Sequence, residues 1–408
     1  MAIKQTQTKL FDFSDAGLDF CAGSKNLFPD RFKKMLTLGY NEQTVSSVSV
    51  AGNQVTLTYG GTHGYVADRV LKIDSGALAS INGGEFWIDS VTTNTVTFTL
   101  DDAPTSVASG FTTQIASLGW ELVYEQAHIH IYKFKHIDDS DMYARLCFQN
   151  ATGTGRNCIA VGIGRTVDLA LGYIADPNCM TDLATCATVT GATSNIRWDF
   201  TSSTARTFDN YTYSQGFATF GKGMVVGSYY HFALMYSQSS SAAYEHFAAV
   251  SAIMPFQSSY DILNYPLLLA QDNGAATITT SGQLSAMRAY LSINRMNLSG
   301  NSSELLDRNN AISSFLPPTI ENFNTTTCQP VAVFTYSERQ FAGYAIGLYQ
   351  VLYNSSNSPA PKKGDFPALI SEIDFSNYVA VHFIKSANSS GSSGTAWLSL
   401  PVEEIKIA

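Results

Sequence analysis

The chain has 408 residues, more than one hydrophobic core usually organises, so two to four domains are expected. Its formal net charge of −9 argues against a nucleic-acid-binding role, because phosphates are neutralised by a basic stripe of Lys and Arg. Charged residues make up only 14%, while Thr, Ser and aromatic residues are abundant, which favours β-sheet. We therefore predict an all-β, multi-domain protein of β-sandwich or β-barrel-like modules with few short helices.

Residues 1–42 are predicted to form an N-terminal arm. Turn signals occur at residues 14–17 and 28–30. Asp30 is the expected N-cap of a short helix that runs toward Leu36. Such an arm either packs on its own domain or extends to a neighbouring subunit, and the sequence leaves both alternatives open.

Residues 43–117 are predicted to form a small, complete β-module. Apolar and polar residues alternate over residues 45–59 and again over 86–100, which is the period-2 pattern of half-buried strands. Gly-containing dipeptides separate these runs and predict tight turns. Four residues of these turns are expected to shape the module rather than to bind a ligand: His63, Gly64, Asn82 and Gly83.

Residues 118–300 are predicted to form a central β-sandwich region. A hairpin is expected at residues 131–148, around the Asp-rich turn at 138–141. Residues 151–193 are rich in Gly, Asn and Thr, which favours long loops between short strands. The remaining predicted strands cover residues 208–213, 224–229, 231–236, 244–249, 263–269 and 286–294.

Residues 301–408 are predicted to form a C-terminal β-region. The polar segment 301–314 is the best candidate for a domain boundary, and the residues at 354–365 and 386–394 are expected to be exposed loops that clasp adjacent chains. Strands are predicted at residues 328–336, 344–353, 378–384 and 395–400. The sequence leaves open whether this region is a separate domain or an extension of the preceding sandwich.

Two groups of residues between positions 128 and 141 carry side chains of the kinds that bind metal ions. The even spacing of the three histidines at 128, 130 and 136 would place them on one face of a strand, but His136 would lie far from the other two and no close third ligand is evident. The aspartates at 138, 139 and 141 lack the glycine and the distant glutamate of an EF-hand loop. Both groups therefore predict ordinary strand and turn structure.

Candidate catalytic groups are equally sparse. Glu85 and Asp89 lie four residues apart on a predicted strand, roughly 13 Å along it, which is too far for a glycosidase carboxylate pair. The sequence Gly162-Ile163-Gly164 lacks the Lys and Ser/Thr of a phosphate-binding loop. We predict no catalytic residue, no cofactor-binding residue and no metal site, and hence a protein that is not an enzyme.

The cysteines are expected to be free and mostly buried thiols. None belongs to a C-x-x-C pair, and so large a chain needs no disulfide staples. No apolar run is long enough to span a membrane, and the N-terminus lacks the apolar core of a signal peptide. The six cysteines are Cys21, Cys147, Cys158, Cys179, Cys186 and Cys328.

Several motifs occur in an order that is similar to a known family. HGY, VLKI and NGGEFWIDSVTTNTVTFT follow one another within residues 63–99. They are preceded by LGYNEQTVSSVSVAGN and followed by LGWELVYE and YKFKHIDDSDMYARLCF. Over residues 35–165 this order resembles a family of structural proteins in the particles of tailed bacteriophages. The motifs are turns and strands rather than catalytic residues.

The resemblance implies a structural component of the phage particle, which we expect in the tail, tail tip, tail-fibre attachment or baseplate. It would form symmetric contacts, as a trimer or ring, with itself and other virion structural proteins. It would be made in the host cytoplasm and end in the virion. One alternative is a head-decoration or head–tail joining protein. Another is a tail protein that binds host-surface receptors or glycans or degrades glycans, because aromatic rings stack on sugars.

Overall fold

The structure is a computed structural model of the chain. It describes residues 8–150, 157–192, 197–200, 209–237, 245–256, 265–270, 291–293, 328–335, 340–351, 368–370, 379–385 and 395–402. The segments 301–314, 354–365 and 386–394, expected as a boundary and as exposed loops, lie outside these residues. The described strands form several antiparallel sheets with few short helices, which confirms the predicted all-β class, and they include no closed barrel.

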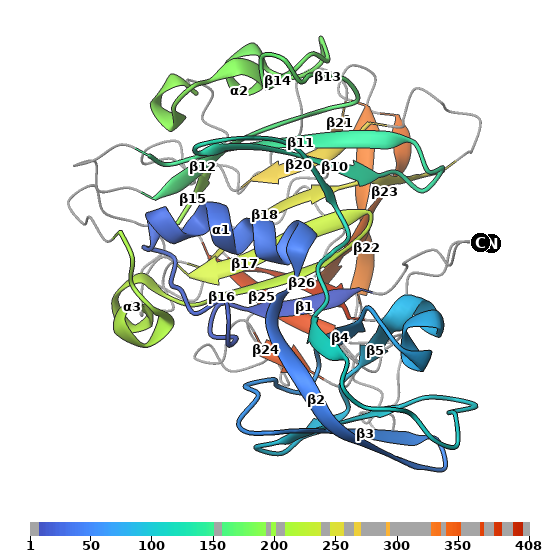
Figure 1. The fold of residues 1–408 in the computed structure, drawn as a ribbon. Helices are drawn as coiled ribbons and strands as arrows, with labels where there is room; N and C mark the ends of the chain where they lie inside the picture. Colours follow the sequence, from blue (N-terminus) through green and yellow to red (C-terminus); the bar gives the residue numbers. More distant parts are fainter. Residues whose placement is uncertain are drawn as a thin grey trace, which may run out of the picture.

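The predicted β-module is a seven-stranded antiparallel sheet at the lower end of Figure 1. Its strand order is β5 (Glu85–Trp87), β4 (Val70–Ile73), β8 (Thr112–Ile115), β2 (Tyr40–Ala51), β3 (Gln54–Tyr59), β7 (Thr95–Thr99) and β6 (Ser90–Val91). The long strand β2 pairs first with β8 and then with β3, and both ladders contain a bulge. The sheet therefore bends along β2, and Phe86 of β5 stacks on Phe98 of β7 with ring centroids 4.5 Å apart.

A five-stranded antiparallel sheet forms the centre of the molecule (Figure 1). Its order is β1 (Lys9–Asp12), β16 (Gly223–Ser228), β17 (His231–Ser237), β18 (Glu245–Ser251) and β20 (Leu267–Ala270). Because β1 pairs with β16, the described part of the N-terminal arm packs on its own chain. Strands β16 and β17 are buried at every residue, as expected for a sheet that is covered on both faces.

A second five-stranded sheet covers one face of the central sheet and completes a β-sandwich. Its order is β15 (Arg197–Asp199), β12 (Cys158–Gly164), β11 (Asp141–Phe148), β10 (Ile129–Lys135) and β9 (Glu121–Gln126). Trp198 of β15 stacks on Phe232 of β17 in the core between the sheets, with ring centroids 5.9 Å apart. Helix α1 (Phe28–Lys33) contributes Phe32 to the same core. The hairpin predicted at residues 131–148 is confirmed as β10 and β11.

A third sheet covers the opposite face of the central sheet. Its order is β21 (Leu291–Ile293), β22 (Cys328–Thr335), β23 (Phe341–Val351), β26 (Thr395–Pro401), β25 (Val379–Lys385) and β24 (Ala368–Ile370), and β19 (Ile253–Pro255) pairs with β23. Val226 and Met235 of the central sheet and Val333 of β22 share the core between these two layers. Since β19 and β21 precede residue 301, the C-terminal region extends the preceding sandwich rather than forming a sheet of its own.

Short elements complete the fold. Hairpin β13 (Val167–Asp168) and β14 (Tyr173–Ile174) and helix α2 (Thr181–Thr185) lie over the outer face of the second sheet (Figure 1). Glycines on β12 permit this close packing. A Cβ atom at Gly162 would lie 2.7 Å from the carbonyl oxygen of Leu183, and one at Gly164 would lie 2.6 Å from Asp176 Cβ. Gly162 and Gly164 thus serve packing between layers.

The predicted N-cap at Asp30 is wrong. Helix α1 begins at Phe28, its N-cap position is occupied by Leu27, and a proline stands in its first turn. Asp30 lies inside that first turn, where a carboxylate is favoured by the helix dipole, and its Oδ2 lies 3.1 Å from Lys34 Nζ. The helix thus begins two positions before the acidic residue, directly after a 3₁₀ turn at Lys25–Leu27.

The strand predicted at residues 208–213 is also wrong within the described residues. Residues 209–212 form no strand, and helix α3 (Tyr213–Phe220) begins directly after them. The hydroxyl of Thr212 accepts a hydrogen bond from the backbone N–H of Gln215, and the Gln215 side chain accepts one from the Thr212 N–H. This capping box stabilises a helix whose composition alone favours extended structure.

Candidate functional site

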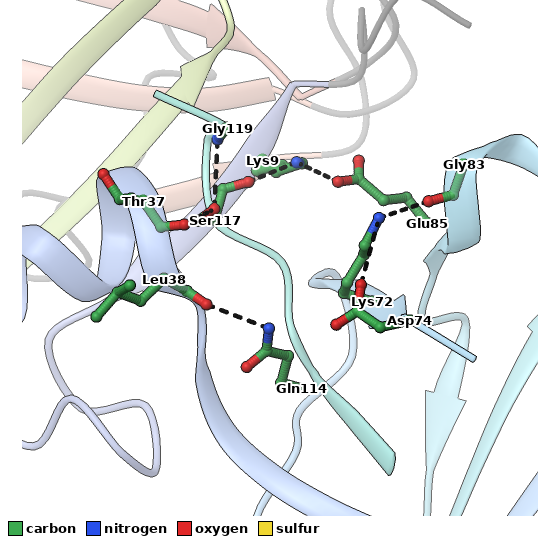
Figure 2. Close-up of polar contacts among 10 residues, drawn as sticks. All are labelled: Lys9, Thr37, Leu38, Lys72, Asp74, Gly83, Glu85, Gln114, Ser117 and Gly119. Atoms are coloured by element: carbon green, nitrogen blue, oxygen red, sulfur yellow. Dashed lines mark hydrogen bonds and ion pairs between the residues drawn. The ribbon is translucent and has the colours of Figure 1, made fainter. Parts of the chain in front are cut away.

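A buried ion pair connects the central sheet to the small module (Figure 2). The Nζ atom of Lys9, on β1, lies 2.8 Å from Oε1 of Glu85 at the start of β5, and the two side chains are 2% and 9% exposed. The same ammonium group donates a hydrogen bond of 2.5 Å to the carbonyl oxygen of Ser117. Burial lowers the pKa of Lys9, and the Glu85 carboxylate opposes that shift. Lys9 therefore ties three segments that are distant in sequence.

The chain segment that leaves the module is held to the N-terminal helical region. The Ser117 hydroxyl donates to the carbonyl oxygen of Thr37 at 2.9 Å and accepts from the N–H of Gly119 at 3.3 Å. The Gln114 amide donates to the carbonyl oxygen of Leu38 at 3.2 Å (Figure 2). These contacts fix the path by which the chain passes from β8 into the sandwich.

The turn before β5 has the backbone conformation that the Asn-Gly dipeptide predicts. Asn82, Gly83 and Gly84 all have positive φ, at 49°, 65° and 75°. They do not form a two-residue hairpin turn; they form a 3₁₀ turn at the end of the longer connection between the paired antiparallel strands β4 and β5. Lys72 of β4 donates a hydrogen bond of 2.5 Å to the carbonyl oxygen of Gly83 (Figure 2). A Cβ atom at Gly84 would lie 2.1 Å from the Ile73 carbonyl oxygen.

A second buried ion pair joins the module to the segment after β1. The Arg69 guanidinium donates from Nε to Asp15 Oδ2 at 2.8 Å and from Nη2 to Asp15 Oδ1 at 2.9 Å. The Tyr40 hydroxyl donates to Asp15 Oδ2 at 2.7 Å. Burial alone would lower the pKa of Arg69, but the Asp15 carboxylate raises it. With Lys9 and Glu85, this pair attaches the module to the body at two buried points.

The HGY motif shapes the module, as its sequence suggested. Nδ1 of His63 accepts a hydrogen bond from the backbone N–H of Tyr65 at 2.9 Å, so Nε2 carries the proton and donates to the Thr95 carbonyl oxygen at 3.1 Å. Gly64 has a φ of 73°, and a Cβ atom there would lie 2.8 Å from the Ala16 methyl group. The motif is therefore a packed turn against the arm.

The three histidines at 128, 130 and 136 each have a separate partner. Strand β10 carries only His130, whose Nδ1 lies 2.8 Å from the Tyr132 hydroxyl and whose pKa is lowered by burial to about 4. His128 contacts the carbonyl oxygen of Ala187 at 2.7 Å, and His136 contacts a carboxylate in the following turn. The described residues contain no group of His, Cys, Asp or Glu side chains arranged to hold a metal ion.

The Asp-rich turn is satisfied by its own hairpin. Asp138 Oδ1 accepts from the N–H of Ser140 at 2.9 Å, which is an Asx turn. Asp139 takes a positive φ of 66° and its carbonyl oxygen accepts from Lys135 Nζ at 3.1 Å. Lys135 also pairs with Asp141. The turn is accounted for by hairpin geometry.

Glu85 and Asp89 do not form a carboxylate pair. Glu85 is engaged by Lys9, whereas Asp89 lies beyond the end of β5 and accepts a hydrogen bond of 2.7 Å from the Thr99 hydroxyl. The two carboxylates therefore have separate, structural partners.

A group of four apolar side chains, three of them exposed, lies on the third sheet. We call Met254, Phe256, Phe341 and Tyr344 the aromatic cluster. Phe256 is 65% exposed, and its ring centroid lies 5.4 Å from that of Phe341, which in turn lies 5.0 Å from Tyr344. The cluster is held by the pairing of β19 with β23. Sequence analysis missed it because no strand was predicted at residues 253–255. Because contiguous exposed apolar patches are typical of interaction sites, the aromatic cluster is the candidate contact surface.

Comparisons with known proteins give no family assignment. A scan against protein-family models found no match, and a search of curated proteins found no similar sequence. None of the helices in the described residues is both long enough and apolar enough to cross a bilayer.

Proposed function

We propose that this protein is a structural component of a tailed bacteriophage particle, in the tail, tail tip or baseplate. It acts through symmetric contacts with copies of itself and with other virion proteins rather than through catalysis. The order of motifs over residues 35–165 supports the phage assignment, and the aromatic cluster is the observation that supports a role in subunit contact.

The aromatic cluster has the properties of an interface core. On β23, Ala345 enters the core between the layers, whereas the side chain of the preceding Tyr344 is 38% exposed. Aromatic residues and Met are enriched, and charged residues depleted, at the centres of protein interfaces. Burying one Phe side chain on association would contribute about 2 kcal/mol, or roughly thirtyfold in the dissociation constant.

The two buried ion pairs support a module that keeps a fixed orientation within an assembly. Lys9–Glu85 and Arg69–Asp15 connect it to the body through charged groups with little water access. Because breaking such a pair leaves an uncompensated buried charge, the module is held in one orientation. A fixed orientation lets two surfaces of one subunit engage neighbours in a regular array.

The aromatic cluster also favours one function of another class, which is glycan binding at the host surface. The exposed rings of Phe256 and Tyr344 have the flat apolar faces on which pyranose rings stack. A glycan array separates the two proposals: retention of a glycan that is lost in Phe256→Ser would favour the binding role.

Self-association tests the proposed contact. We expect the purified chain to form a trimer or ring in sedimentation velocity, and Phe256→Ser to shift the dissociation constant upward by about thirtyfold. Leu171→Ser is the matched control, because Leu171 is 58% exposed but lies in the β13–β14 connection. Equal weakening by both substitutions, or a chain that stays monomeric and is absent from purified particles, would contradict the proposal.

A further inference from the structure

One buried arginine has no carboxylate partner among the described residues. Arg145 of β11 is fully buried. Its Nε donates to the carbonyl oxygen of Gly172 and its Nη2 to that of Cys186, both at 2.7 Å, and its Nη1 donates to Cys186 Sγ at 3.4 Å. A buried cation is stable when negative charge compensates it. Among these acceptors, only the Cys186 sulfur can become an anion.

A second thiol lies beside this sulfur. Cys147 stands two residues after Arg145 on β11, so both side chains project from the same face of the strand. The hydrogen bond from the Cys147 thiol, followed by the Arg145 guanidinium, lowers the pKa of Cys186 despite its burial. The same hydrogen bond, with burial, raises the pKa of Cys147. One sulfur is therefore prepared to lose its proton while its neighbour keeps one.

Cys179 provides an internal comparison, because it is buried to nearly the same degree. Cys186 is 6% exposed and Cys179 is 4% exposed, and both belong to the layer that covers β12. Burial raises the pKa of Cys179 to about 12. The Cys179 thiol therefore keeps its proton at neutral pH. A difference in reactivity between the two cysteines would therefore reflect a difference in thiol ionisation, because the two residues are exposed to solvent to a similar extent.

We propose that Cys186 and Cys147 are a redox-active thiol pair, in which a hydroperoxide oxidises Cys186 and Cys147 then closes an intramolecular disulfide. This goes beyond the proposed role in the particle and does not depend on it. The described cysteines are free and buried in the reduced chain, and they are Cys21, Cys147, Cys158, Cys179 and Cys186.

The chemistry requires two steps. The Cys186 thiolate attacks one oxygen of the hydroperoxide, the O–O bond breaks, and the leaving alkoxide or hydroxide takes up the proton that the thiol released. The Cys147 sulfur then attacks the sulfenic acid, the S–S bond forms as the S–O bond breaks, and hydroxide leaves with the Cys147 proton as water. Two thiols and one hydroperoxide give one disulfide, one alcohol or water from the peroxide, and one further water. The new bond would fasten the end of α2 to β11.

Peptide mapping of the full native chain tests the proposal. The reduced protein is treated with hydrogen peroxide at pH 7.5, blocked with N-ethylmaleimide under denaturing conditions, digested and analysed by mass spectrometry. We expect a peptide that joins Cys147 to Cys186, and oxidation of Cys186 at least about a hundredfold faster than that of Cys179. This measurement needs no variant, so it does not depend on whether a substituted chain folds.

Variants separate the two roles. In Cys147→Ser, dimedone should trap a sulfenic acid on Cys186, because the resolving thiol is gone. Cys179→Ser is the matched control and should leave the disulfide unchanged. A disulfide that joins other cysteines, or oxidation of Cys186 no faster than that of Cys179 in the native wild-type chain, would overturn the proposal.

Discussion

The buried pair between Lys9 and Glu85 allows a quantitative prediction. At 2.8 Å and an effective dielectric constant of about 20, the attraction is roughly 6 kcal/mol, and desolvation of both groups offsets much of it. Removing one partner leaves the other charge buried, which typically costs about 3–5 kcal/mol. Lys9→Met also removes the donor to the Ser117 carbonyl oxygen. We therefore expect Lys9→Met to lower the unfolding free energy by about 4 kcal/mol.

The assay is guanidinium denaturation combined with hydrogen exchange of the amides in β4, β5 and β8, because a chain of several layers need not unfold in one step. Lys133→Met is the matched control, since Lys133 and its partner Glu121 are 25% and 60% exposed and such a pair contributes under about 1 kcal/mol. The double variant Lys9→Met with Glu85→Leu should recover most of the loss, because no buried charge remains. Equal losses for Lys9→Met and Lys133→Met, or no recovery in the double variant, would refute the reasoning.

Two further predictions concern acid and the turn before β5. Burial lowers the pKa of His130 to about 4 and that of His231 to about 3. Below pH 6.5 the unfolded chain therefore binds more protons than the folded chain, so the unfolding free energy falls as the pH drops. For His130 alone, the loss at pH 4 is about 3 kcal/mol. Denaturation midpoints at pH 6.5 and 4 should differ less in His130→Asn than in wild type, and an equal difference would contradict this. Gly84→Ala should cost more than about 3 kcal/mol, because its Cβ would meet the Ile73 carbonyl oxygen, whereas Gly83→Ala should cost only about 1 kcal/mol, for φ alone. Similar melting temperatures for the two alanine variants would show that the contact with the Ile73 carbonyl oxygen does not destabilise the fold.

Local patterns predicted much of the sheet structure. The alternation over residues 45–59 corresponds to half-buried side chains in β2 and buried ones in β3, and the Asp-rich turn corresponds to the β10–β11 hairpin. The buried runs of β16 and β17 are apolar on both faces because a sheet covers each face, so they were recognisable as strands. These features depend on neighbouring residues only, which is why a single sequence reveals them.

Contacts between distant segments were not predictable. Lys9 and Glu85 are 76 residues apart, and β1 pairs with a strand more than two hundred residues later. No local pattern signals such partners, so the sequence could not predict where the N-terminal arm packs or how the small β-module attaches to the body. Helix α3 was missed for a different reason: its Gly, Thr and aromatic residues favour extended structure, and the signal was the capping box of Thr212 and Gln215.

Cryo-electron microscopy of the intact particle that contains this chain tests the central claim most directly. We expect density for the three-layered fold at the tail end, repeated by rotational symmetry, with the aromatic cluster buried against a neighbouring subunit. A particle that lacks this density, together with a purified chain that binds or cleaves host glycan, would contradict the structural role.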